Sequence, residues 1–244
     1  MPSPVLRVCA LYPDLMNIYA DRGNLLLLQQ RCAWRGLGFQ LTGAGLGDAI
    51  DPAAHDLFYM GGGQDRDQAL CAQDLVDTKR DALHTAVDRG AVVLGVCGGY
   101  QLLGHSYELG DEHLPGVGLL DLRTVRHDGP RLIGNVAIEV DLPGAGRRIV
   151  AGFENHGGRT HLASGQAPLG RVLKGHGNTG ESGAEGAICG SVLGTYIHGP
   201  LLPKNAWLAD WLTERALGLD EPLAPLDDGM EDAAHASAKA AAGL

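Results

Sequence analysis

Apolar and polar positions alternate between two kinds of pattern over about the first hundred residues. Short apolar runs bounded by polar or glycine-rich segments are typical of buried strands, whereas apolar positions three and four residues apart are typical of one helix face. Their repeated succession predicts βαβ units and a parallel sheet with helices on both faces. The predicted strands are 5–11, 39–43, 56–60 and 91–96, and the predicted helices are 24–34, 65–90 and one that begins at Tyr100.

The pattern changes in the second half of the chain. From about residue 114 to 195, glycine and β-branched residues dominate, which predicts additional strands, antiparallel in part. Residues 203–217 predict a helix, and the alanine-rich tail from 221 to 244 is expected to be poorly ordered, either frayed or a loose helix. No repeat or linker interrupts residues 1–220, so we expect one α/β domain there: an open, mostly parallel sheet flanked by helices.

Charge and cysteine content narrow the functional classes. A net charge of -10 argues against a nucleic-acid partner or an anionic membrane surface. No apolar run approaches the ~18 residues that a membrane span needs, and the N-terminus lacks the features of a signal peptide. The 5 cysteines are scattered without a CxxC pair, which favours neither a disulfide framework nor a zinc site. We therefore expect a reduced, cytoplasmic protein.

The clearest chemical signal is a cysteine between glycines at the end of the predicted strand 91–96. Gly95-Val96-Cys97-Gly98-Gly99 has the strand–turn–helix context of a nucleophile elbow. A helix that begins just after Cys97 is expected to lower the pKa of its thiol, and the Gly98 amide is placed to donate to an oxyanion. A free cysteine in an apolar strand is usually a core residue, but the glycine pattern favours a nucleophile. A phosphate-binding loop is disfavoured because no Lys-Ser/Thr follows.

Two further segments supply what a cysteine nucleophile needs, a base and a second oxyanion donor. MGGGQD (60–65) ends another predicted strand, so the amide of Gly62 or Gly63 is placed to face Cys97. On this motif alone, a glycine-rich turn without a ligand is an equally good interpretation. His198 ends an apolar strand just before a turn. A lone histidine there is more often structural, but its pairing with an elbow cysteine favours a general base.

Two other motifs do not carry a site. GHGNTG (175–180) matches G-x-G-x-x-G, but no helix follows it, so a dinucleotide site is not expected. His105, Asp111, Glu112 and His113 lack the spacing of metal ligands and are better explained as a solvated loop, so no metal is expected.

Together, these residues resemble the class I (triad-type) glutamine amidotransferases, which have a flavodoxin-like fold, and within them the cobyric-acid-synthase-like branch. The similarity extends to the GatD-type glutaminase subunits of lipid II isoglutaminyl synthase. The segments that carry it span most of the chain apart from its tail. They are LYPDLMNIYADRGN (11–24), MGGGQD (60–65), GVCGGYQLLG (95–104), RLIGN (131–135), GFENHGGRT (152–160) and TYIHGPLLPKN (195–205).

The resemblance implies hydrolysis of L-glutamine to glutamate and ammonia. Cys97 would attack the side-chain amide and form a γ-glutamyl thioester, while His198 would deliver a proton to the departing ammonia and then activate water. The oxyanion hole would consist of Gly98 with Gly62 or Gly63.

The same resemblance implies how glutamine is held. Gln101, Arg131 and the turn Asn155-His156-Gly157 would form the binding site. A planar guanidinium suits an α-carboxylate, although without the resemblance Arg131 is as readily a solvated charge at a strand end.

The ammonia also needs an acceptor. With no P-loop in the sequence, we expect no cofactor on this chain. The resemblance implies a separate Mur-ligase-like (MurT-type) partner that binds ATP, Mg²⁺ and lipid II and amidates the D-glutamate of the peptidoglycan stem. Open alternatives are another acceptor such as a cobyrinate, a stand-alone cysteine hydrolase of γ-glutamyl bonds, and a non-catalytic binding subunit.

One departure concerns the group that orients the histidine. Many triad amidotransferases have an acid two residues after it, but here Gly199 and Pro200 follow His198. The cobyric-acid-synthase-like branch shares this feature. We hypothesise that the partner subunit or Glu154 supplies the orienting carboxylate.

Overall fold

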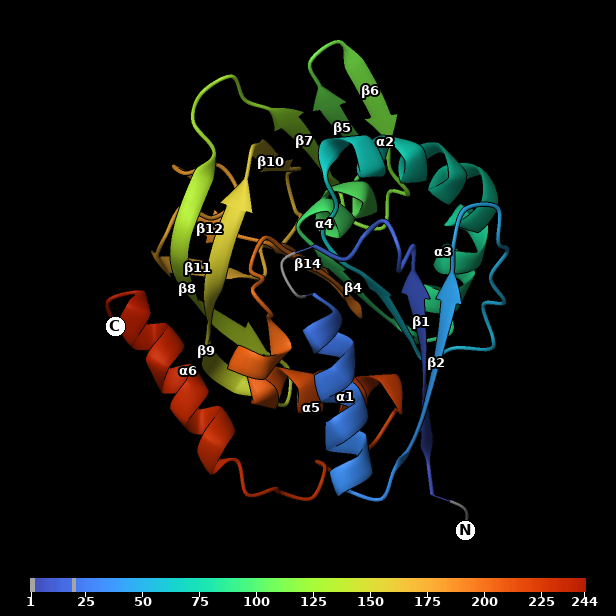
Figure 1. Ribbon diagram of the computed structural model, residues 1–244, viewed down its shortest axis with the longest axis vertical. Helices are drawn as coiled ribbons and strands as arrows, with labels where there is room; N and C mark the ends of the chain where they lie inside the picture. Colours follow the sequence, from blue (N-terminus) through green and yellow to red (C-terminus); the bar gives the residue numbers. More distant parts are fainter. Residues whose placement is uncertain (1–2, 19–20) are drawn as a thin grey trace.

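The computed structural model describes residues 3–18 and 21–244 and has a six-stranded sheet at its centre (Figure 1). The strand order is β13-β14-β4-β3-β1-β2, and every neighbouring pair is parallel except β13–β14. The predicted open, mostly parallel sheet is thus confirmed. Tyr19 and Ala20, inside the segment 11–24, lie outside the described residues. The strands are β1 (Val5–Leu11), β2 (Gly38–Ala44), β3 (Leu57–Met60), β4 (Val92–Val96), β13 (Ala187–Cys189) and β14 (Val192–Thr195).

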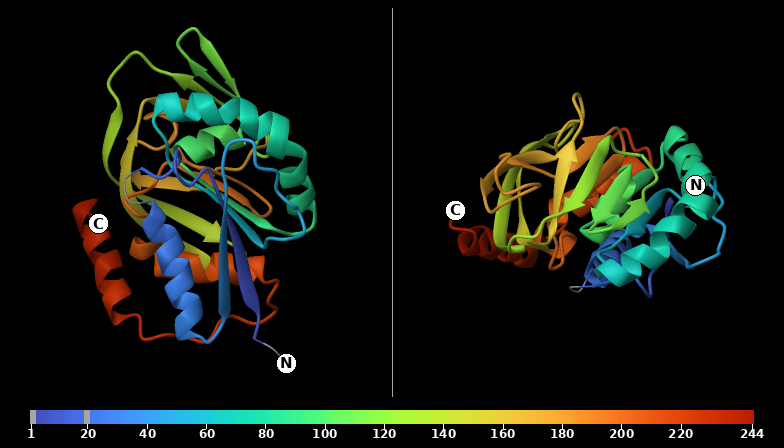
Figure 2. Two further views of the ribbon diagram at one scale, coloured as in Figure 1. Left: turned by 45° about the vertical axis from the view of Figure 1, so that its right-hand side comes forward. Right: turned by 90° about the horizontal axis from the view of Figure 1, so that it is seen from above.

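Helices cover both faces of this sheet, as the alternating pattern predicts. Helices α1 and α5 lie on one face and α2, α3 and α4 on the other (Figures 1 and 2). Among the described residues, every helix is too short or too polar to cross a membrane. The helices are α1 (Arg22–Trp34), α2 (Asp65–Asp74), the π-helical turn η1 (Leu75–Lys79), α3 (Arg80–Asp88), α4 (Gly98–Leu103), the 3₁₀ turn η2 (Leu202–Lys204), α5 (Ala206–Ala216) and α6 (Gly229–Ala241).

The strand-rich second half forms two further four-stranded sheets. Their orders are β10-β7-β5-β6 and β12-β11-β8-β9, and every neighbouring pair except β5–β7 is antiparallel. The expected additional antiparallel strands are therefore present. They are β5 (Ser106–Leu109), β6 (Glu112–Pro115), β7 (Leu122–Arg126), β8 (Leu132–Leu142), β9 (Gly146–His156), β10 (Gly158–Leu162), β11 (Gly170–Lys174) and β12 (Ala184–Glu185).

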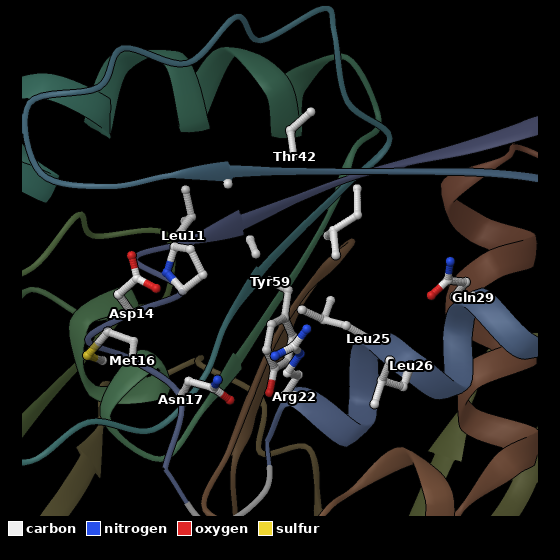
Figure 3. A pocket seen from close by; sticks show the side chains of 14 residues that line it. Leu11, Asp14, Met16, Asn17, Arg22, Leu25, Leu26, Gln29, Thr42 and Tyr59 are labelled. Atoms are coloured by element: carbon white, nitrogen blue, oxygen red, sulfur yellow. The ribbon is translucent and has the colours of Figure 1, made fainter.

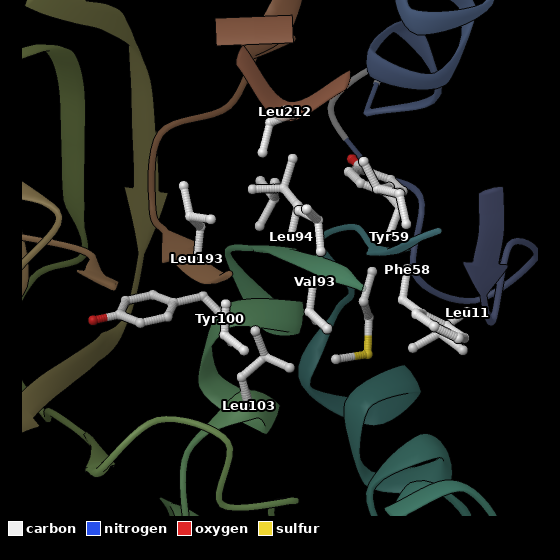
Figure 4. Close-up of a cluster of buried hydrophobic side chains, with 14 of the residues drawn as sticks. Leu11, Phe58, Tyr59, Val93, Leu94, Tyr100, Leu103, Leu193 and Leu212 are labelled. Atoms are coloured by element: carbon white, nitrogen blue, oxygen red, sulfur yellow. The ribbon is translucent and has the colours of Figure 1, made fainter. Parts of the chain in front are cut away.

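The hydrophobic core lies on both sides of the central strands. Every residue of β3 and β4 is buried, because parallel strands covered by helices on both faces have no solvent-facing side. Leu94 points toward Leu212 of α5, while Val93 lies on the side of Leu103 of α4 (Figure 4). The carboxyl ends of these rigid strands, which meet at one edge of the sheet, position the candidate site.

The last two helices differ from the sequence-based expectation. The helix predicted over 203–217 begins only at Ala206, because Asn205 uses its side chain to bind both the amide and the carbonyl of Ala151 on β9. The tail, expected to be either frayed or a loose helix, contains the helix α6. Ala238 packs there against Ala137 and Ala151, and these small side chains let the helix lie close to the sheet.

Candidate active site

Cys97 connects β4 directly to α4 in a strained backbone conformation. Its φ of 52 and ψ of -104 lie in a region that L-residues rarely adopt. The strand ladder and the helix hold it there, since the Cys97 amide donates to Thr195 and its carbonyl accepts from Gln101. Helix α4 begins at Gly98 rather than at Tyr100, so the thiol lies immediately before the helix. This is the geometry expected of an elbow.

The glycine-rich loop after β3 lies against this elbow. A Cβ on Gly62 would be 3.4 Å from the Cβ of Cys97, and a Cβ on Gly98 would be 3.0 Å from the Gly63 nitrogen. The Gly62 amide donates a 2.7 Å hydrogen bond to the buried carboxyl of Asp21. That amide is thus already engaged, which favours Gly63 over Gly62 as the oxyanion donor of the predicted pair. The sequence patterns did not single out Asp21.

His198 lies at the same edge of the sheet as Cys97. It follows β14, whose last residue Thr195 pairs with Val96, so parallel neighbouring strands deliver the histidine and the cysteine side by side. The backbone of His198 is fixed by two hydrogen bonds with Phe153 of β9, of 2.9 and 3.1 Å. The side chain is fully buried.

Burial keeps both groups neutral in this chain. Desolvation, followed by the charge of Asp21, raises the pKa of the Cys97 thiol to about 12, against the opposing effects of Arg131 and the Gly98 amide. Desolvation, followed by the charges of His156, Lys204 and Arg131, lowers the pKa of His198 to about 4. The lowered thiol pKa expected from the helix is therefore not found, because removal from water outweighs the partial charge of a short helix.

A cavity of about 350 Å³ opens beside Cys97. It brings together residues from distant parts of the chain, including two from the β4–α4 segment, one directly before β8 and two where β9 meets β10. The predicted site residues that line it are Gly63, Cys97, Gln101, Arg131, His156 and Gly157, and the lining residues not predicted are Ile18, Gln64, Asp65, Arg66, Gln68 and Tyr107.

Asn155 is connected to the cavity by hydrogen bonds from Arg131, which lines it. The Arg131 guanidinium donates from Nε to the side-chain oxygen of Asn155 and from Nη2 to its carbonyl, both at 2.8 Å. One edge of the guanidinium is used in this way, and its end-on edge, formed by Nη1 and Nη2, remains for an anion.

Tyr196 holds two of the predicted glutamine-binding side chains in place. The Gln101 side chain donates a 3.1 Å hydrogen bond to the Tyr196 hydroxyl. The His156 ring stacks on the Tyr196 ring at 3.5 Å between centroids. A buried tyrosine after β14 shows no special spacing in the sequence, so its role appears only in the folded chain.

Glu154 lies behind the cavity and is fully buried. Its two carboxylate oxygens accept hydrogen bonds from the amides of His176 and Gly177, at 2.6 and 2.9 Å. The glycines of the GHGNTG motif thus shape a loop around a carboxylate. Glu154 is also 3.6 Å from Nε2 of His156, and its charge acts to raise the pKa of His198.

A second cavity, of about 450 Å³, lies beyond this site between α1, β1 and β2 (Figure 3). None of the predicted site residues lines it. Met16 forms part of its wall, and a Cβ on Gly63 would overlap the Met16 sulfur. The two cavities are therefore separated by the segment that supports the glycine-rich loop.

Comparison with known proteins agrees with this geometry. Residues 7–206 match the CobB/CobQ-like glutamine amidotransferase domain. The chain is 41% identical over 204 residues to the Staphylococcus aureus lipid II isoglutaminyl synthase (glutamine-hydrolyzing) subunit GatD, covering 83% of this chain and 81% of that protein. The Streptococcus pneumoniae subunit of the same name is 38% identical, covering 87% and 80%. A cobyric acid synthase of Pelotomaculum thermopropionicum is 40% identical, but the match covers 55% of this chain and only 28% of that protein.

Solved structures show the same fold at low sequence identity. The Thermotoga maritima PurLQS structure contains a chain that superposes with a TM-score of 0.59 at 19% identity, covering 87% of this chain and 95% of that one. The glutaminase domain of Trypanosoma brucei CTPS gives 0.55 at 12% identity, covering 90% and 96%.

Proposed function

Because the chain belongs to the family of CobB/CobQ-like glutamine amidotransferases, we propose that it is the glutamine-hydrolysing subunit of a cytoplasmic lipid II isoglutaminyl synthase. The observation that carries this function is the placement of Cys97 and His198 after neighbouring parallel strands, with Cys97 lining a cavity that has an arginine in its wall.

The chemistry begins with Cys97. Its sulfur attacks the side-chain carbonyl carbon of glutamine, and the amides of Gly63 and Gly98 stabilise the oxyanion, an interaction worth about 3 kcal/mol per donor. His198 takes the thiol proton and gives it to the departing nitrogen, so that the C–N bond breaks and ammonia leaves a γ-glutamyl thioester. Water activated by His198 then releases glutamate.

The cavity binds glutamine through the charged α-carboxylate of this substrate. The end-on edge of Arg131 binds the α-carboxylate, while its other edge stays fixed on Asn155. Gln101, His156 and Gly157 shape the wall around the substrate side chain.

The ammonia passes to a Mur-ligase-like partner of the MurT type, which binds ATP, Mg²⁺ and lipid II. The length of the matches supports this acceptor over a cobyrinate, since the GatD subunits match over most of their length and the cobyric acid synthase over 28% of its own.

The partner also supplies the carboxylate that orients His198. Supporting this is the position of Glu154, whose carboxylate is held by the amides of His176 and Gly177 and lies 3.6 Å from His156, which gives it a structural role behind β9. We expect the isolated chain to release ammonia from glutamine far more slowly than the complex, and Glu154→Gln to reduce the folded fraction rather than the rate of the folded complex. Full activity of the isolated chain would contradict a carboxylate in trans.

The function is tested by reconstitution with the candidate ligase. Amidation of lipid II is measured with ATP and either glutamine or ammonium chloride, using wild type, Cys97→Ala and, as a matched control, Cys189→Ala at an exposed free cysteine. Cys97→Ala is expected to abolish the glutamine-driven reaction and to retain the ammonium-driven one, while Cys189→Ala retains both. Glutamine-driven amidation by Cys97→Ala would overturn the proposal.

A further inference from the structure

The cavity beside Cys97 has one acidic residue among the described residues that line it. That residue is Asp65, the first residue of α2, directly after the glycine-rich loop. The cationic groups of the same wall include Arg131 and Arg66. A cavity of this kind offers an anionic and a cationic contact at once, which matches an amino acid in its zwitterionic form.

The Asp65 carboxylate is held in a fixed orientation by two other elements. The Tyr107 hydroxyl of β5 donates a 3.3 Å hydrogen bond to Oδ1, and the Arg126 guanidinium of β7 pairs with Oδ2. The Arg126 side chain also lies against the β9–β10 turn, where a Cβ on Gly157 would be 2.9 Å from its Nε. A side chain at position 157 would therefore have to displace the guanidinium that orients Asp65.

Asp65 keeps the capacity to bind a further donor. Each carboxylate oxygen accepts more than one hydrogen bond, and each has a single partner among the described residues. The Asp65 side chain is 38% exposed, so a ligand in the cavity has access to it. The charges of Asp65 and Arg131 also act on the Cys97 thiol with opposite sign, which places both near the reacting sulfur.

We propose that Asp65 binds the α-ammonium group of glutamine, opposite the α-carboxylate contact of Arg131. The inference rests on the proposed glutaminase function and adds the group that recognises the substrate amine. Arg126 pairs with Asp65 and orients it, and the substrate ammonium supplies a second charge-assisted hydrogen bond. Amides that lack an α-amino group are thereby discriminated against.

The test compares glutamine with glutaramate, the same amide without its α-amino group. Ammonia release is measured for the reconstituted complex with both substrates, using wild type and Asp65→Asn. Asp65→Asn is expected to lower kcat/KM for glutamine roughly 10- to 100-fold, as for loss of a hydrogen bond to a charged group, mainly through KM. The value for glutaramate should change less than about threefold, because that substrate never uses the contact.

Two further variants separate recognition from folding. Tyr107→Phe removes one of the two groups that orient Asp65. It should lower kcat/KM for glutamine relative to kcat/KM for glutaramate, by a smaller factor than Asp65→Asn does. Asp67→Asn, two residues further along α2 and not among the residues that line the cavity, is the matched control and should leave the ratio of the two kcat/KM values unchanged. Ammonium-driven amidation should be unaffected throughout.

An equal fall for both substrates, or no fall for glutamine, would overturn the role of Asp65. A wild-type complex that released no ammonia from glutamine would instead overturn the proposed function, so the two failures are distinguishable.

Discussion

The imidazole of His198 is fully buried, and the titratable groups that act on it are His156, Lys204, Arg131 and Glu154. Three of these groups disfavour its protonated form, and only Glu154 favours it. Cys97 is neutral for the same reason, namely burial. With the thiol and the imidazole both neutral, the nucleophilic thiolate is not yet formed. The transfer of a proton from Cys97 to His198 then requires added stabilisation of the ion pair, which a carboxylate from a partner would provide.

The first prediction follows from the lowered pKa of His198. Between pH 6.5 and about 4, the unfolded state binds a proton on this histidine and the folded state does not. The stability contribution is therefore intact above pH 6.5 and is lost as the pH falls toward 4. Relative to His198→Gln, which cannot titrate there, the free energy of unfolding of the wild type should fall by about 3 kcal/mol over this window.

Urea unfolding at a series of pH values, with the difference between the two proteins plotted, measures this effect. The difference is needed because other groups act with the opposite sign. Burial raises the pKa of Asp21 to about 7 and that of Glu185 to about 8, so both make the folded state bind protons more readily as the pH falls. A difference that stays flat with pH would contradict the buried, neutral imidazole.

Two of the predicted site residues have a local signature, whereas the predicted glutamine-binding residues came from the family resemblance. Cys97 has its flanking glycines and His198 its position at a strand end. Asp21, Asp65 and Tyr196 lack such a signature, because they act through contacts with segments far away in the sequence. The direction of the thiol pKa was also missed, since burial depends on the whole fold and not on the neighbouring helix.

At the scale of elements, the site depends on how β9 crosses the segment after β14. The apolar pattern predicted the central strands well, because β3 and β4 are buried on both faces and read as unbroken apolar runs. It did not predict the π-helical turn η1 inside the helix of 65–90. There, Lys79 is buried and its ammonium pairs with Asp74 at 2.6 Å, an arrangement that apolar spacing does not encode.

The second prediction concerns Gly152 on β9. A Cβ at this position would lie 2.5 Å from Cγ2 of Ile197 and 3.0 Å from the carbonyl oxygen of His198. Gly152→Ala should therefore displace the histidine and lower glutamine-dependent ammonia release by the complex at least about tenfold, because catalytic groups tolerate little misplacement.

Gly134→Ala, on the neighbouring strand β8, is the matched control for Gly152→Ala. A Cβ at position 134 would meet no heavy atom within 4 Å, and Gly134 pairs with Glu154 in the same ladder. This variant should keep its activity and its ammonium-driven amidation. Equal activity of the two variants would show that the backbone of His198 is not positioned through β9.

At the scale of the whole molecule, the tail links α1 to the β8–β9 hairpin. Asp228 pairs with Arg31 of α1, and Ala238 packs against the hairpin. A loose helix was one of the two expectations for this tail, but the surface on which it packs was not predictable, because alanine favours helix formation while a face of small side chains has only a weak amphipathic pattern. Small side chains pack closely only when the opposing surface is also small, as Ala137 and Ala151 are. That match becomes visible only when the hairpin and the tail are placed together.

The third prediction concerns the anchor at the start of α6. Arg31 of α1 is buried and pairs with Asp210 of α5 at 2.6 Å and with Asp228, the residue directly before α6, at 2.7 Å. Asp228→Ala leaves Arg31 its Asp210 partner, so the free energy of unfolding should fall by only about 1–2 kcal/mol. The loss should be concentrated in α6, where amide hydrogen exchange is expected to become roughly tenfold faster, whereas exchange in β3 and β4 stays unchanged.

Asp232→Ala, in the first turn of the same helix, is the control for Asp228→Ala. Asp232 has no ion pair among the described residues, so its variant should leave exchange in α6 within a factor of about two. Uniform acceleration across the sheet would show instead that Arg31 supports the core, and an unchanged α6 would show that its alanine face alone holds the tail in place.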